Sequence, residues 1–179
     1  CTKSNEGFAT AGGVQYVACA GNFKDAGLEY TGALKVLQMI FSYEYLWIQI
    51  RVKGGAYGCM CSFSDQGDSM FVTYRDPNLS ESYKVYDEAA DYVADFDADD
   101  RDMKKYIIGT IGSMDMPMEA VDMGARSFHA YFLGKTEADL QKVRDQVLSC
   151  TQEDIRALAP IVKAVVEAGN RCCIGNEEK

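Results

Sequence analysis

The sequence predicts an α+β domain in which a mostly antiparallel sheet is covered by helices on one face. Three observations indicate this fold class. A β-branched and aromatic run occurs near the N-terminus, a long stretch repeats apolar residues at intervals of three and four, and two more strand-like runs flank a group of turn residues. A block of helical patterns and a closing strand complete the chain.

The first strand and the first helix are predicted within the first third of the chain. Residues 1–11 are small and polar, so we expect them to form a frayed end. Residues 14–19 are rich in strand-forming side chains and predict the first strand. The helical repeat over 34–51 follows, and Gly54 and Gly55 are expected to end that helix.

A β-hairpin and another helix come next. Residues 57–63 and 70–74 predict paired strands, because the polar segment 64–69 between them has the composition of a turn. The next apolar repeat predicts a helix over 80–96, with Ser80 as its N-terminal cap.

The rest of the chain is predicted to contain four helices and a last strand. Hydroxyl residues just ahead of acidic ones mark two of the helix starts, because such pairs satisfy the free N–H groups there. The predicted elements are a short helix over 100–112, a helix from Pro117 through Phe132 that ends at Gly134, helices beginning at Thr136 and Thr151, and a strand over 171–175.

Composition narrows the possible functions. The 179 residues are enough for one domain, which we expect to span 1–179. A net charge of −9 excludes a basic surface for nucleic acid, and no run of about 18 apolar residues predicts a membrane span. The seven cysteines are odd in number and scattered, which indicates reduced thiols and a cytoplasmic or similarly reducing location.

Several motifs are more simply explained by structure than by chemistry. His129 is the only histidine and lies among aromatic residues of a predicted helix, where packing or exposure is commoner than metal binding. Cys59 and Cys61 share one face of a strand and suit core thiols. Residues 95–99 imitate the start of a calcium loop but lack its later glycine and glutamate, so they predict a helix cap. Residues 134–136 lack the preceding glycine of a phosphate loop.

The candidate site is the stretch from Leu46 to Gly58. Arg51 offers a planar fork of donors and Tyr57 offers a phenolic donor, while Gly54 and Gly55 permit a tight turn that an extended peptide can approach. The pair therefore suits carbonyl oxygens. The alternative is structural: Arg51 pairs with a neighbouring carboxylate and Tyr57 covers the sheet.

This stretch also resembles a known family. The sequence is similar to the C-terminal half of the insulinase (pitrilysin) family of zinc metallopeptidases, and most similar to its presequence protease subgroup. The likeness extends over nearly the whole chain. It is carried mainly by Tyr30-Thr31-Gly32-Ala33-Leu34-Lys35-Val36-Leu37, Tyr45-Leu46-Trp47, Ile50-Arg51-Val52-Lys53-Gly54-Gly55-Ala56-Tyr57-Gly58, Tyr74-Arg75-Asp76-Pro77-Asn78 and the terminal Gly175-Asn176-Glu177-Glu178.

The resemblance implies a peptidase built as two homologous halves around a chamber. In that family the N-terminal half binds zinc through H-x-x-E-H and activates water, while the opposite half supplies an arginine and a tyrosine. By this resemblance, Arg51 and Tyr57 would be catalytic residues that bind the substrate backbone near the scissile bond and help to stabilise the developing oxyanion, and Gly54 and Gly55 would line the approach. This chain has one histidine and so cannot contain H-x-x-E-H. It is expected to be an excised C-terminal domain, inactive alone, whose partners are the N-terminal catalytic half and a peptide substrate.

Other classes of function remain open. The chain is alternatively a non-catalytic subunit of the same fold, or a module that captures an extended peptide by strand addition. It is also compatible with a purely architectural domain whose apolar faces pack against sibling domains. In that case the isolated chain is expected to self-associate.

Overall fold

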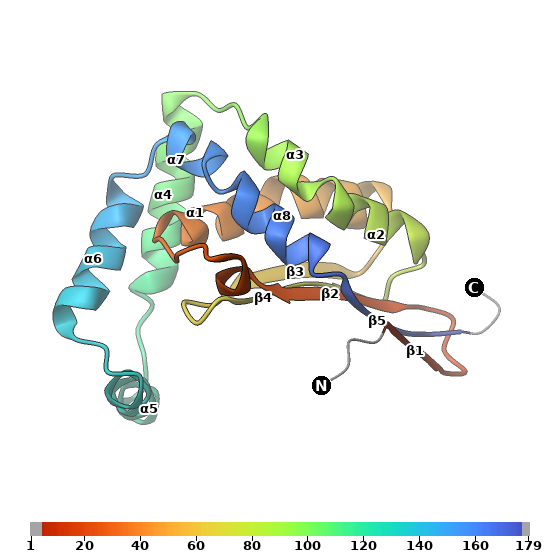
Figure 1. Cartoon of the computed structure of the whole chain (residues 1–179), viewed down its shortest axis with the longest axis horizontal. Coiled ribbons are helices and arrows are strands. Elements are labelled where there is room, and N and C mark those ends of the chain that lie inside the picture. The colour runs from red at the N-terminus through yellow and green to blue at the C-terminus, as the bar shows by residue number, and fades with distance from the viewer. Residues whose placement is uncertain (1–4, 177–179) are drawn as a thin grey trace.

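The sheet contains the four predicted strands and one strand that was not predicted. The computed structural model describes residues 5–176, and within them five strands form one sheet in the order β1-β5-β2-β4-β3 (Figure 1). β1 runs parallel to β5, and the other neighbouring pairs are antiparallel, which confirms the predicted fold class. The strands are β1 (Glu6–Ala9), β2 (Tyr16–Asn22), β3 (Gly58–Phe63), β4 (Asp68–Tyr74) and β5 (Asn170–Gly175).

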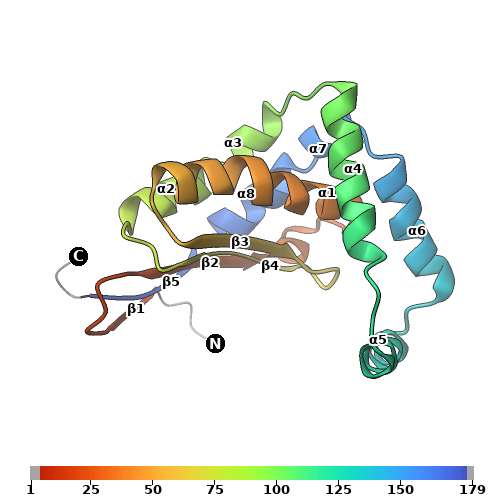
Figure 2. The ribbon, with the colours of Figure 1, turned by 180° about the vertical axis from the view of Figure 1, so that it is seen from behind.

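Most of the helices lie on one face of this sheet, as the view from behind shows (Figure 2). The core between the layers includes Val17, Phe41 and Phe71, each fully buried. No helix in the described range is long and apolar enough to cross a membrane. The α-helices are α1 (Ala33–Ile40), α2 (Ser80–Asp87), α3 (Ala89–Ala94), α4 (Asp100–Met114), α5 (Ala120–Phe132), α6 (Glu137–Leu148), α7 (Gln152–Arg156) and α8 (Ala159–Glu167).

The first helix extends two residues beyond its predicted end. After α1 it continues through π-helical turns over Phe41–Tyr45 and Trp47–Lys53, so that the whole helix runs along the covered face of the sheet toward the candidate site. Gly54 occupies the C-terminal cap, which confirms the prediction that glycine ends this helix. The apolar side chains of the helical repeat lie on one side of the helix and are buried in the core.

Two predictions about the limits of regular secondary structure were wrong. The predicted frayed end lies partly outside the described residues, but Glu6–Ala9 forms β1 because it pairs with β5. The predicted helix over 80–96 is divided at Glu88 into α2 and α3, and Leu79 rather than Ser80 occupies the cap position. Tyr86, Ala89 and Val93 nevertheless remain buried on one side, so the break keeps the predicted apolar face.

The later helices begin and end close to their predicted limits. Thr136 and Thr151 both form reciprocal capping boxes with the aspartate three residues later, as predicted. The last predicted helix is divided into α7 and α8, since Pro160 lies in the first turn of α8, where its missing N–H costs no helical bond. Pro117 precedes α5 instead of occupying its first turn.

One helix and one sheet face remain uncovered within the described residues. None of the α5 side chains is buried, and the helix stands away from the sheet (Figure 2). Its exposed apolar side chains are Val121, Met123, Phe128, Tyr131 and Phe132. On the sheet, side chains that alternate with the buried ones are exposed to solvent: Tyr16, Met60, Met70, Tyr74 and Ile174.

Candidate functional site

Arg51 lies in the last turn of the long helix and is held by its neighbours. Its guanidinium donates a hydrogen bond to the backbone carbonyl of Tyr57. The guanidinium carbon also lies 4.3 Å from the centre of the Trp47 ring and 5.6 Å from the centre of the Tyr57 ring. A cation over aromatic faces is attracted to them, so these contacts restrict where the side chain points.

Tyr57 lies between the end of the long helix and the start of β3, and it is exposed to solvent. Its side chain is 64% exposed, and within the described residues its hydroxyl makes no hydrogen bond. The ring meets Tyr74 edge-on at 5.7 Å between centroids, and Tyr74 meets Tyr16 at 5.5 Å. The aromatic contacts therefore fix the ring while the phenolic donor faces solvent.

The two glycines make the turn between Arg51 and Tyr57 possible. A Cβ on Gly54 would lie 2.5 Å from the carbonyl oxygen of Ile50, a distance that no side chain tolerates. Gly55 has a φ of +80°, in the left-handed region that glycine adopts without steric cost. The backbone N–H of Gly55 donates to the carbonyl of Arg51, which closes the turn.

The loop after β4 supports this turn from behind. The side-chain amide of Asn78 donates to the Gly54 carbonyl at 2.6 Å. Asp76 is fully buried and accepts from the Asn78 backbone N–H at 2.9 Å and from the Ser82 hydroxyl at 2.5 Å. The sequence analysis named Asp76 only within a segment that carries the family resemblance and missed this role. The available signal was an aspartate directly before a proline, because Asp-Pro favours the start of a turn and an aspartate side chain there can accept from the backbone N–H two residues on.

The structural alternative for the pair is only partly realised. No ion pair of Arg51 occurs among residues 5–176, although the sequence offers many carboxylates. Tyr57 does cover the edge of the sheet through Tyr74, as that alternative expected. The structure thus brings all four predicted residues, Arg51, Gly54, Gly55 and Tyr57, into one helix end and the turn that follows it.

The other candidate residues lie elsewhere and have structural roles. His129 is exposed on α5. Cys59 and Cys61 face the core, and burial raises the pKa of Cys59 to about 11 against an opposing effect of Arg51, so both suit the predicted core thiols. Asp99 caps α4 by accepting from two backbone N–H groups, as predicted. Within residues 5–176, no three His, Cys, Asp or Glu side chains form a group able to hold a metal.

Comparison with known proteins places the chain in a family. A family model described as the PreP C-terminal domain matches residues 5–176. The chain is 44% identical over 177 residues to "Protein HypA" of Clostridium perfringens, covering 99% of this chain and 18% of that protein. It is 33% identical over 175 residues to "Presequence protease 1, chloroplastic/mitochondrial" of Arabidopsis thaliana, covering 97% of this chain and 16% of that protein. The chain therefore spans less than a fifth of the length of these relatives.

Solved structures share the fold at low sequence identity. A peptidase M16 inactive domain from Pseudomonas fluorescens superimposes with a TM-score of 0.68 at 15% identity, covering 97% of this chain and 43% of that chain. Pitrilysin superimposes with a TM-score of 0.61 at 13% identity, covering 96% of this chain and 19% of that chain. These likenesses confirm the predicted fold class of this chain.

Proposed function

Because this chain belongs to the PreP C-terminal domain family of the insulinase (pitrilysin) group, we propose that it forms one substrate-contacting wall of a longer zinc-dependent peptidase. The observation that carries the proposal is the pairing of Arg51 with Tyr57 at an exposed turn. Both side chains are restricted by neighbouring rings and keep donors that no described residue uses. Such donors fit the backbone carbonyl oxygens of a peptide substrate enclosed in a chamber.

The chemistry follows from what the two groups donate. The oxygen of a peptide carbonyl gains negative charge as the carbonyl is attacked. Donors that are already oriented toward that oxygen therefore stabilise the transition state more than the ground state. In this proposal the Arg51 guanidinium and the Tyr57 hydroxyl supply those donors, and the Gly54-Gly55 turn lets the peptide backbone come close.

The H-x-x-E-H zinc motif of the family is not in this sequence. The sequence contains one histidine, and the described residues contain no group of three metal-binding side chains. Under the proposal, the zinc and the residues that activate water belong to the N-terminal part of the parent protein. The relatives named as presequence proteases support a peptide substrate, and the Arabidopsis name makes an organelle an alternative to the cytoplasm expected from the thiols.

The test uses the complete parent protein. We expect Tyr57→Phe and Arg51→Ala each to lower kcat by about 10²- to 10³-fold, because the loss of one oxyanion donor costs about 2.7 to 4 kcal/mol. Tyr131→Phe removes a hydroxyl from another exposed tyrosine, and Arg101→Ala removes another exposed guanidinium, so these variants are matched controls. Normal turnover in the Arg51 and Tyr57 variants, with the fold intact, would show that the pair is structural.

A second measurement concerns the chain alone. We expect the purified 179-residue chain to cleave no peptide, because the proposal assigns the metal to the rest of the parent. Proteolysis by this chain that a chelator abolishes would contradict the proposal.

The second candidate function is peptide capture without chemistry. β3 lies at the edge of the sheet and begins directly after Tyr57, so one side of this strand has no neighbouring strand among the described residues. An extended peptide can add to such an edge through backbone hydrogen bonds. This candidate predicts that the isolated chain binds an unmodified peptide but not the same peptide with alternate N-methylated amides.

A further inference from the structure

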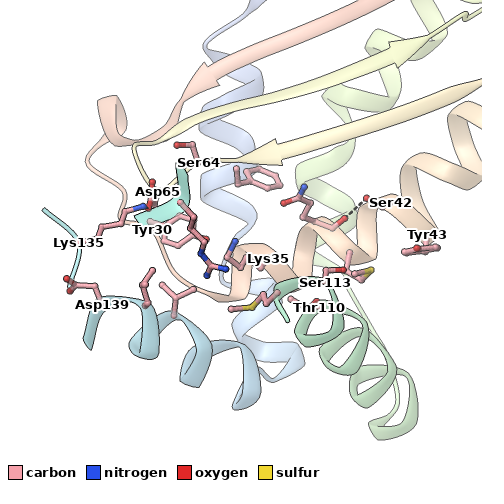
Figure 3. Close-up of a pocket in the computed structure, with 17 residues that line it drawn as sticks. Tyr30, Lys35, Ser42, Tyr43, Ser64, Asp65, Thr110, Ser113, Lys135 and Asp139 are labelled. Atoms are coloured by element: carbon pink, nitrogen blue, oxygen red, sulfur yellow. Dashed lines mark hydrogen bonds and ion pairs between the residues drawn. The ribbon is translucent and has the colours of Figure 1, made fainter. Parts of the chain in front are cut away.

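A cleft lies at the far end of the first helix from Arg51. It has a volume of about 730 Å³ and lies among the start of α1, α4, α5, α6 and the β3-β4 hairpin. Figure 3 shows Lys35 and Tyr30 in its centre and Lys135 beside Asp65 at one side. Arg126 of α5 also lines it. Three cations from separate elements therefore face one hollow.

Among the described residues, only one of these three cations forms an ion pair, although Asp65 also attracts Lys35 and Asp115 attracts Arg126 at longer range. Lys135 forms an ion pair with Asp65. Asp139, the other carboxylate of the lining, accepts hydrogen bonds from the backbone and the hydroxyl of Thr136 and so serves the helix cap. Within residues 5–176, neither the Lys35 ammonium nor the Arg126 guanidinium forms an ion pair, and the hydrogen bond of Arg126 runs to the Met118 sulfur at 3.9 Å.

The charged form of Lys35 is disfavoured at its position in the cleft. Burial lowers the pKa of Lys35, and Arg126 and Lys135 lower it further by repulsion, against the opposing attraction of Asp65. The whole chain carries a net charge of −9, so a cluster of cations in one cleft is not a reflection of general composition. An anion between Lys35 and Arg126 would relieve their repulsion.

The lining also supplies neutral donors and an apolar floor. Burial raises the pKa of Tyr30 to about 12, so its hydroxyl stays protonated and can donate. Ser64 and Ser113 add hydroxyl groups. Met39 and Phe63 supply the apolar part of the lining. Two positively charged side chains, several hydroxyl groups and an apolar wall together match a small molecule with an anionic head group.

We propose that this cleft binds a small anionic ligand through Lys35 and Arg126, by a phosphate or a carboxylate group. Arg126 is suited to two parallel hydrogen bonds to either group, and Lys35 acts as a point charge deeper in the cleft. The site is separate from the Arg51 turn, and its existence does not depend on the proposed peptidase role.

Isothermal titration of the chain with tripolyphosphate and with citrate, at constant ionic strength, tests the proposal. We expect saturable binding of at least one anion at one site per chain. Lys35→Met and Arg126→Gln should each weaken that binding by tenfold or more. Lys142→Gln is the matched control, because it removes one exposed positive charge from α6 outside the cleft lining.

The two anions distinguish the chemistry of the ligand. Tighter binding of tripolyphosphate supports a phosphate-bearing ligand, and tighter binding of citrate supports a carboxylate. Arg126→Gln changes an exposed side chain and keeps the test valid if Lys35→Met disturbs folding. Absence of saturable binding for both anions, or equal weakening by Lys142→Gln and Arg126→Gln, would overturn the proposal.

Discussion

Replacement of Asp76 by alanine tests how the Arg51 turn is supported. The Asp76 carboxylate is fully buried and accepts from the Asn78 backbone N–H at 2.9 Å and from the Ser82 hydroxyl at 2.5 Å. Alanine leaves both donors without this acceptor. An unsatisfied buried donor costs about 1–3 kcal/mol, which gives a total of about 2–6 kcal/mol.

The lower half of that range is the better estimate. The Ser82 hydroxyl lies 3.4 Å from the Asn78 carbonyl and can turn toward it, so one of the two donors finds a partial replacement. We therefore expect Asp76→Ala to lower the free energy of unfolding by about 2–4 kcal/mol. Asp76→Asn keeps one acceptor oxygen for Asn78, and its amide can donate to Ser82, so its cost should be about 1 kcal/mol.

Urea denaturation of both variants provides the measurement. The midpoint should shift while the slope with urea stays constant, since the surface exposed on unfolding does not change. The amide resonances of Gly54 and Gly55 should also shift in Asp76→Ala, because Asn78 bonds the Gly54 carbonyl. An unfolding free energy within about 0.5 kcal/mol of the unmodified chain, the usual scatter of surface changes, would refute this account of the loop.

Three further outcomes follow from single features. Gly55→Ala should cost about 1–2 kcal/mol in urea denaturation, because the φ of +80° is a left-handed conformation that a Cβ opposes. Phe128→Ser with Phe132→Ser should reduce self-association in light scattering and leave the urea midpoint nearly unchanged, since both side chains are exposed. Hydrogen bonds from Thr136 lower the pKa of Asp139, so its stabilising effect is present above the unfolded pKa and is lost as the pH falls through the folded pKa. The stability difference between the unmodified chain and Asp139→Asn should therefore shrink toward low pH.

Local patterns predicted the elements that local interactions determine. The long helix and the β3-β4 hairpin followed from apolar spacing and turn composition, because both depend on residues close in the sequence. β1 escaped prediction, since its four residues are exposed and include a glycine but no β-branched side chain. It is a strand only because it pairs with β5, more than 160 residues later, and no local signal encodes that pairing.

The candidate site divides in the same way. The arginine, the glycines and Tyr57 lie within seven residues, so their proximity was visible from the sequence. The support from Asn78 reaches across 24 residues, and the pairing of β4 with β3 determines it. The cations of the cleft come from three separate elements, and no spacing rule could have brought Lys35, Arg126 and Lys135 together.

The uncovered helix α5 shows what a correct local prediction leaves undetermined. Its helical pattern was predicted, yet the pattern does not say what its apolar side meets. Isolated helices of about 12–15 residues are marginal in water, and α5 has 13 residues of which none is buried. A helix of this kind gains stability when Phe128 and Phe132 are covered, either by a second copy of the chain or by another domain of the proposed longer peptidase. If a second copy covers α5 in the isolated chain, the mass measured by light scattering should rise with protein concentration.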